Sequence, residues 1–302
     1  MSLRLFVAVL PPPPVVAAWD TLLEPRRDAD PSLRWTLPES WHVTCAFMPA
    51  VPETRLDALA EALDDLGRRQ EAIASLDEAA TILRQADDKS ALVSTLALRG
   101  AIAVSSGDLE RVPAIAAELE ACGTRTGGYL GLISAYALRG LAADARGDVA
   151  EMRREFATAE QLAVSKGHLD VAAVTEAAHA AAELRAGAAA AAQAMALRAL
   201  GRLPEGSATS APMALAQSIL ARIDAAAGRL EAARQRLAPF LDDAANSTSV
   251  SRRIALLAAM AAIDGASGNE AAADSALDRA ITLAHAAGRK LDERDLRQAR
   301  DR

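Results

Sequence analysis

The stretch Trp41–Phe47, WHVTCAF, contains the one pair of residues in this chain whose types and spacing suggest chemistry. His42 and Thr44 stand two positions apart, and in a β-strand such residues point to the same face. Histidine is the side chain that most often transfers protons in catalysis, and a threonine hydroxyl can hydrogen-bond a substrate oxygen. A second pair of this kind is missing, because no hydroxyl residue stands two positions after His168, His179 or His285.

Short elements around this pair would have to position it. Apolar runs that alternate with polar residues or stop at prolines predict strands over 3–13, 33–39 and 42–49. A helix is predicted over 14–25, ended by Pro25 and the charges after it, and another helix begins within 53–63. The expected order over this region is therefore β-α-β-β-α.

The order RW…P…HxT…F…VPE over residues 1–63 resembles the opening of a 2H phosphoesterase. The branch it resembles is the bacterial RNA 2′,3′-cyclic phosphodiesterase, also called 2′-5′ RNA ligase. The resemblance implies that His42 is one of two catalytic histidines, which act as general base and general acid, and that Thr44 holds a phosphate oxygen. It ends near Leu63, before the second motif. We therefore expect residues 1–53 to be an incomplete α/β fragment, inactive unless a dimer brings two His42 side chains together.

Charge and cysteine content limit the class of protein. The net charge is −7 and the pI about 5.3, so no overall basic field would attract nucleic acid. Cys45 and Cys122 are the only cysteines, which argues against a disulfide framework and a cysteine zinc site. The sequence contains no run of about 20 apolar residues and no recognisable signal peptide. We expect a cytoplasmic protein with no membrane span, metal or cofactor.

The composition changes near residue 55. All three tryptophans and nine of the 13 prolines precede it, and the rest is rich in Ala, Leu, Arg, Asp and Glu, which favours helices. Six glycines then recur at intervals of 40 or 41 residues: Gly67, Gly107, Gly147, Gly187, Gly228 and Gly268. A fixed period of this length indicates a stacked repeat. Each unit is predicted to be a helix, a turn at the glycine and a second helix.

Other positions keep the phase of these glycines. The residue seven positions before each glycine is small: Ala60, Gly100, Gly140, Ala180, Ala221 and Ala261. Such residues allow the two helices of a hairpin to approach closely. Positions five and twelve residues after the glycine are also small or apolar, and the seven-residue period of a coiled coil is absent.

This pattern resembles an array of tetratricopeptide (TPR) repeats, lengthened as in the sensor arms of bacterial LuxR- and AfsR-type regulators. The resemblance covers about residues 55–290. It implies a mainly α solenoid of about six helical hairpins over 54–288, followed by a capping helix or tail over 289–302. No P-loop and no DNA-binding module is recognisable in the sequence, so the resemblance to regulators is limited to their sensor part.

The TPR resemblance implies that the first helix of each hairpin lines a concave groove. The groove positions include Ser94, Ser134, Leu141, Asp144, Leu184, Leu215 and Arg222. Arg222 is the one basic residue at these positions, so a clamp for a peptide carboxylate is not expected. The small residues suit an apolar helix of a protein partner or the chain's own C-terminal helix. Asp144 and Arg222 are expected to be solvated charges.

Three functions remain open from the sequence. The first, favoured because most of the chain supports it, is an interaction scaffold or regulatory sensor that binds a protein or peptide in its groove. The second is a cyclic phosphodiesterase that acts on RNA with cyclic phosphate ends. The third is a fusion product without an evolved function.

Overall fold

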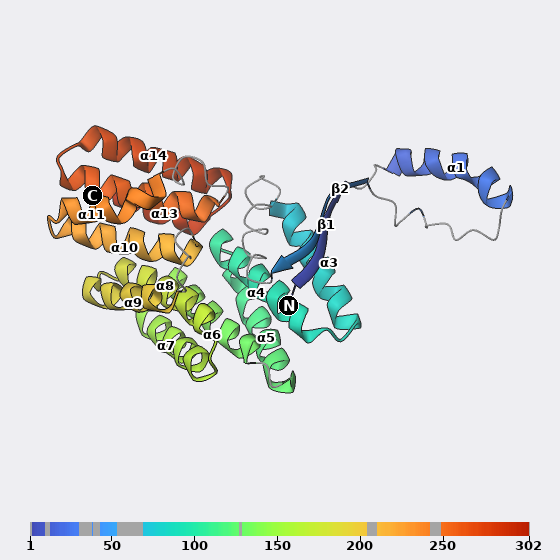
Figure 1. The fold of residues 1–302 in the computed structure, drawn as a ribbon, viewed down its shortest axis with the longest axis horizontal. Helices are drawn as coiled ribbons and strands as arrows, with labels where there is room; N and C mark the ends of the chain where they lie inside the picture. The colour runs from blue at the N-terminus through green and yellow to red at the C-terminus, as the bar shows by residue number, and fades with distance from the viewer. Residues whose placement is uncertain are drawn as a thin grey trace. The chain divides into compact units, whose positions relative to one another are not determined.

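The structure is a computed structural model that describes residues 2–9, 13–29, 38, 43–52, 69–126, 129–203, 210–241 and 249–301. Contacts between residues divide the chain into two compact units, Met1–Asp57 and Ala58–Arg302, which we call unit 1 and unit 2 (Figure 1).

The described residues of unit 1 form two strands that pair antiparallel and one α-helix. In the ladder between β1 (Ser2–Val9) and β2 (Val43–Pro52), Phe6 stands opposite Phe47 and Ala8 opposite Thr44. His42 lies outside the described residues, as do the predicted strand over 33–39, apart from Pro38, and the predicted helix over 53–63.

The prediction that Pro25 ends the first helix is wrong, because α1 spans Pro13–Ala29. A guanidinium nitrogen of Arg27, Nη1, donates to Oδ1 of Asp20 at 2.6 Å. The two residues are seven positions apart and therefore lie on one face of the helix. This ion pair spans the position of Pro25 and joins residues on either side of it.

Unit 2 is a stack of antiparallel helices, which Figure 1 shows following one another side by side. Its helices are α3 (Arg69–Gln85), α4 (Lys89–Ser106), α5 (Val112–Thr126), α6 (Leu130–Arg146), α7 (Val149–Ser165), α8 (Leu169–Arg185), α9 (Ala189–Arg202), α10 (Ala211–Ala226), α11 (Leu230–Leu237), α13 (Val250–Ala266), α14 (Glu270–Ala286) and α15 (Lys290–Arg300). The predicted mainly α repeat solenoid is confirmed.

The turn glycines end the first helix of each hairpin, as predicted. Gly107, Gly147, Gly187, Gly228 and Gly268 have φ between 74° and 80°, a left-handed conformation in which a Cβ is strained. In the first of these turns the amide of Gly107 donates to the carbonyl of Val104, and the amide of Asp108 donates to that of Ala103. This is the Schellman arrangement, and it recurs at the other four glycines. Gly67 lies outside the described residues.

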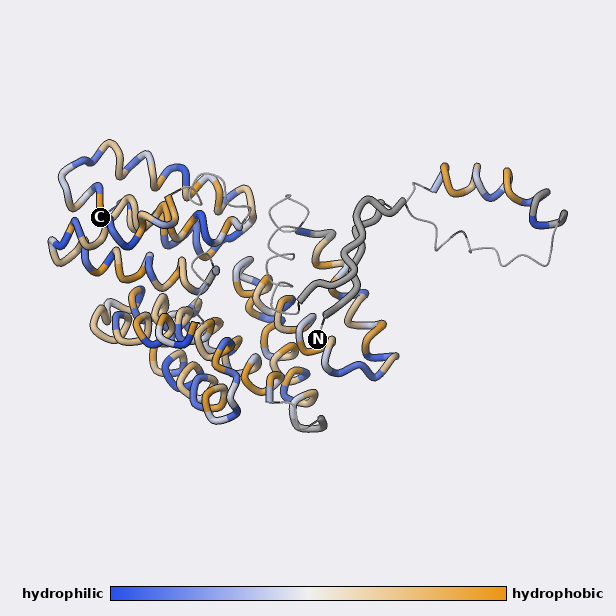
Figure 2. Tube along the Cα trace, viewed as in Figure 1, coloured by the Kyte–Doolittle hydropathy of each residue, from blue (hydrophilic) through white to orange (hydrophobic). Residues whose placement is uncertain are grey.

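Apolar side chains from neighbouring helices form a continuous series of core clusters along unit 2. Figure 2 shows apolar and polar residues alternating along these helices, as expected for helices with one buried face. The repeated position five residues after the turn glycine is buried at Val112, Met152, Ala192 and Ala233. The position twelve residues after it is buried from Leu119 to Ala280.

Small residues allow helices to approach closely, at one site within a hairpin and at another between successive hairpins. A Cβ at Gly140 of α6 would lie 2.9 Å from the ring of Phe156 on α7, its hairpin partner. That ring in turn stacks on His179 of α8, with 5.0 Å between the ring centroids. At Gly100 of α4, a Cβ would instead clash with Leu138 of α6. The small residue there serves the contact between successive hairpins, which the sequence pattern did not predict.

Replacing Gly131 of α6 by alanine should destabilise the solenoid. A Cβ at this position would clash with the backbone carbonyl of Leu119 and lie 2.9 Å from the backbone nitrogen of Gly123. Backbone cannot move aside as a side chain can, so we expect a loss of about 1–3 kcal/mol in the free energy of unfolding. Urea denaturation monitored by circular dichroism measures this change.

The matched control is Gly201→Ala in α9, because a Cβ at Gly201 would meet no described atom within 4 Å beyond its chain neighbours and its own helix backbone. This variant should be about 0.5–1 kcal/mol more stable, because alanine loses less backbone entropy in a helix. Equal effects of the two substitutions would contradict the close approach of α5 and α6.

Candidate binding groove

The predicted groove residues lie on the first helices of successive hairpins. Ser94 is on α4, Ser134, Leu141 and Asp144 are on α6, Leu184 is on α8, and Leu215 and Arg222 are on α10. Contacts between α4 and α6, α6 and α8, and α8 and α10 place these helices side by side. Together they form one continuous wall, which we call the groove wall.

The three leucines among these residues pack against the core beneath the wall. Leu141 packs against the core cluster between α4 and α6, and Leu184 and Leu215 pack against the cluster between α8 and α10. Ser94 and Ser134 are half-buried. Val174 of α8, at a groove position, is 50% exposed and offers an apolar contact to a partner.

Asp144 is not a solvated charge, because it pairs with Arg185 of α8. The guanidinium Nε of Arg185 lies 3.1 Å from Oδ2 of Asp144, and its Nη2 donates to the same carboxylate. Burial disfavours the charged guanidinium, but Asp144, together with the charges of Asp295 and Asp292 on α15, outweighs this effect and the pKa of Arg185 is raised. Arg185 directly follows a groove position, and the sequence reasoning missed it.

Arg222 makes no hydrogen bond or ion pair with any residue that the structure describes. Its side chain is half-buried. Burial lowers the pKa of Arg222, the positive charge of Arg185 lowers it further, and Asp295 of α15 opposes the shift. A guanidinium in this position favours the approach of an acidic group.

The C-terminal helix α15 lies across the C-terminal ends of α4, α6 and α8. Leu291 packs against the core cluster beneath α4 and α6. Nη1 of Arg294 donates to the carbonyl of Ala145 in the last turn of α6 at 3.4 Å, where helix carbonyls lack intrahelical donors. Oδ2 of Asp295 is 3.8 Å from Nε of Arg185. The other face of α15 carries Leu296, which packs against the core of α13 and α14.

A second cluster of ionisable groups is buried between α7, α8 and α9. Glu176, His179 and Glu183 of α8 are each at most 3% exposed. Nδ1 of His179 donates to Oε1 of Glu160 at 2.6 Å, and Glu176 accepts from Arg198 and Arg202 at 3.0 and 2.8 Å. Glu176, His179 and Glu183 stand at positions i, i+3 and i+7 of the segment EAAHAAAE, and this spacing is the sequence signal for the cluster.

Arginines neutralise the carboxylates of this cluster. Nε and Nη2 of Arg153 donate to the two oxygens of Glu183 at 2.6 and 2.7 Å, and these hydrogen bonds lower the pKa of Glu183. Among the described residues, no group of three or more His, Cys, Asp or Glu side chains is arranged to hold a metal ion. The cluster is therefore interpreted as an ion-pair network that joins three helices.

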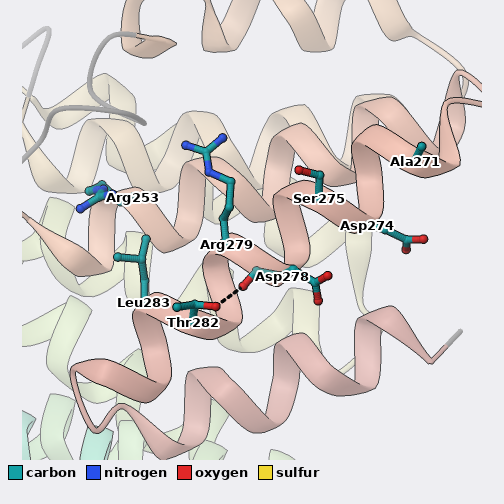
Figure 3. A pocket seen from close by; sticks show the side chains of 8 residues that line it. All are labelled: Arg253, Ala271, Asp274, Ser275, Asp278, Arg279, Thr282 and Leu283. Carbon is teal, nitrogen blue, oxygen red and sulfur yellow. Dashed lines mark hydrogen bonds between the residues drawn. The ribbon is translucent and has the colours of Figure 1, made fainter.

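The outer surface of the last complete hairpin carries a shallow, open depression of about 640 Å³. Figure 3 shows Arg253 of α13 at one side and Asp274, Asp278 and Arg279 of α14 along it. Asp278 is paired with Arg300 of α15 at 2.8 Å. The depression is an open, solvent-exposed surface with charged side chains along it.

Comparisons with known proteins support the fold alone. No protein-family model matches the chain, and no curated protein matches it. A similar solved structure is BtubC (BKLC) from P. vanneervenii, with a TM-score of 0.54 and 16% sequence identity. The match covers 72% of this chain and 91% of that one. No helix in the described residues is long and apolar enough to cross a membrane.

Replacing Arg202 by alanine should destabilise unit 2. The change removes one of the two donors to Glu176, whose side chain is 1% exposed. A buried acceptor that loses a partner costs about 1–3 kcal/mol, measured as a lower free energy of unfolding in urea. The control is Arg154→Ala, because Arg154 is 65% exposed and pairs only with its neighbour Glu155. A change within about 0.5 kcal/mol is expected there, and equal losses would contradict the role of the network.

Proposed function

We propose that unit 2 is an interaction scaffold or regulatory sensor module, a TPR-like solenoid that binds a protein or peptide partner on its groove wall. The observation that carries this proposal is the side-by-side arrangement of α4, α6, α8 and α10. These helices offer one continuous surface that no single hairpin could provide. Solenoids of stacked repeats commonly use such extended surfaces for binding.

The chemistry of the wall favours a helical partner. Alanines at groove positions, such as Ala97, Ala137 and Ala181, are half-buried and leave the backbone accessible to close approach. The exposed Val174 adds an apolar contact. An amphipathic helix that lays its apolar face into a groove needs these two features.

A charge placed on the groove wall should weaken partner binding. Peptide ligands would first be selected from a random library against the full chain. Val174→Glu should then reduce their affinity at least tenfold, because an unpaired carboxylate would be buried at the interface. Isothermal titration calorimetry measures this change.

Leu197→Glu on α9 is the matched control, since Leu197 is 49% exposed on the second helix of the same hairpin. It should leave the affinity unchanged. If no peptide is selected, or if both variants bind as the wild type does, the groove wall is not the binding surface.

A second candidate function is the cyclic phosphodiesterase that the resemblance of unit 1 implies. It is supported by the antiparallel pairing of β1 and β2, which places Thr44 opposite Ala8 in a ladder. With one HxT motif in the sequence, we expect the purified full chain not to hydrolyse a 2′,3′-cyclic nucleotide. Turnover that His42→Ala abolishes would contradict this expectation and make unit 1 an enzyme.

A further inference from the structure

We propose that α15 is a displaceable internal ligand of the groove wall. We further propose that the partner that replaces it is a helix presenting a leucine and, four residues later, a carboxylate. This inference rests on the proposed scaffold function, and it names the chemistry of the partner.

The face that α15 turns toward the wall has a simple pattern. Leu291 and Asp295 are four positions apart, and such residues lie one above the other on a helix. Leu291 packs against the cluster that includes Val104 and Leu141, and Asp295 approaches Arg185. A helix with the same pair of residues reproduces both contacts.

The charges of the wall require the carboxylate. Arg185 and Arg222 carry two positive charges at this end of the groove, and Asp144 supplies one negative charge through its pair with Arg185. One positive charge remains, and α15 supplies the acidic groups that face it. Asp295 lies 3.8 Å from Arg185 while also pairing with Arg294 of its own helix at 2.9 Å, and the charge of Asp292 also acts on Arg185. A partner that displaces α15 must bring its own acidic group, because an unneutralised guanidinium would otherwise be covered.

α15 is attached through fewer buried residues than the helix that precedes it. Its sequence, KLDERDLRQAR, has seven charged residues among eleven, and its one fully buried residue is Leu296. The preceding helix α14 buries five residues. Segments with few buried apolar contacts open locally at a lower free energy than the core. Gly288 lies in the turn between α14 and α15 and has φ of 62°.

The test uses the full chain and a fluorescent peptide with the sequence of residues 289–302. Leu291→Ala combined with Asp295→Ala weakens the docking of α15 and retains Leu296. A tethered segment acts at an effective concentration of roughly millimolar, so wild type should bind the peptide at least tenfold more weakly than this double variant. Fluorescence anisotropy measures both affinities.

Arg297→Ala is the control, because Arg297 is 50% exposed and its side chain pairs with Glu293 of the same helix. It should bind as wild type does.

A peptide carrying Asp295→Ala should bind the double variant at least tenfold more weakly than the unchanged peptide does. The inference is overturned if the double variant, with an unchanged melting curve, binds the peptide no better than wild type. It is also overturned if loss of the aspartate has no effect. Failure of the scaffold function gives a different result: the peptide still exchanges with α15 as expected, but no library peptide binds any form of the chain.

Discussion

Close approach of helices over glycine and alanine is the constraint on which the rest of unit 2 depends. A helix rich in alanine cannot bury much apolar area alone, so each helix has to come close to two neighbours to form a core. Gly131 lies against the backbone of α5, and Gly140 admits the ring of Phe156. That ring reaches His179 on the next hairpin, so the contact couples three helices. The left-handed glycine turns then fix the direction in which each hairpin reverses.

The same stacking produces the continuous groove wall. Because the first helices of the hairpins adjoin one another, residues at equivalent positions of different repeats are brought into one wall. Charged groups at the end of this wall then interact across repeats, as Asp144 of α6 does with Arg185 of α8. The C-terminal helix contacts this end of the wall through Leu291, Arg294 and Asp295. The buried network around Glu176 stabilises the hairpins beneath it.

The sequence predicted the features that repeat, since a fixed period reports local geometry. The turns at Gly107, Gly147 and Gly187, and the buried positions after them, follow directly from it. Turns between hairpins have no residue type in common: the residue with positive φ is Gly167 in one turn and Asp87 in another. The pairing of Arg185 with Asp144 joins residues 41 positions apart, and nothing in either local segment indicates it. The continuation of α1 past Pro25 to Ala29 was missed because a proline is a strong stop signal.

Hydrogen exchange of the full chain, measured by mass spectrometry, tests the central claim most directly. If α15 is a separately opening segment on a cooperative solenoid, its amides should exchange clearly faster than those of α14, α6 and α8. Exchange of the latter helices should remain slow while α15 opens. If α15 exchanges at the same rate as α14, the two helices open only together. In that case α15 is a fixed part of the core and cannot act as a displaceable ligand.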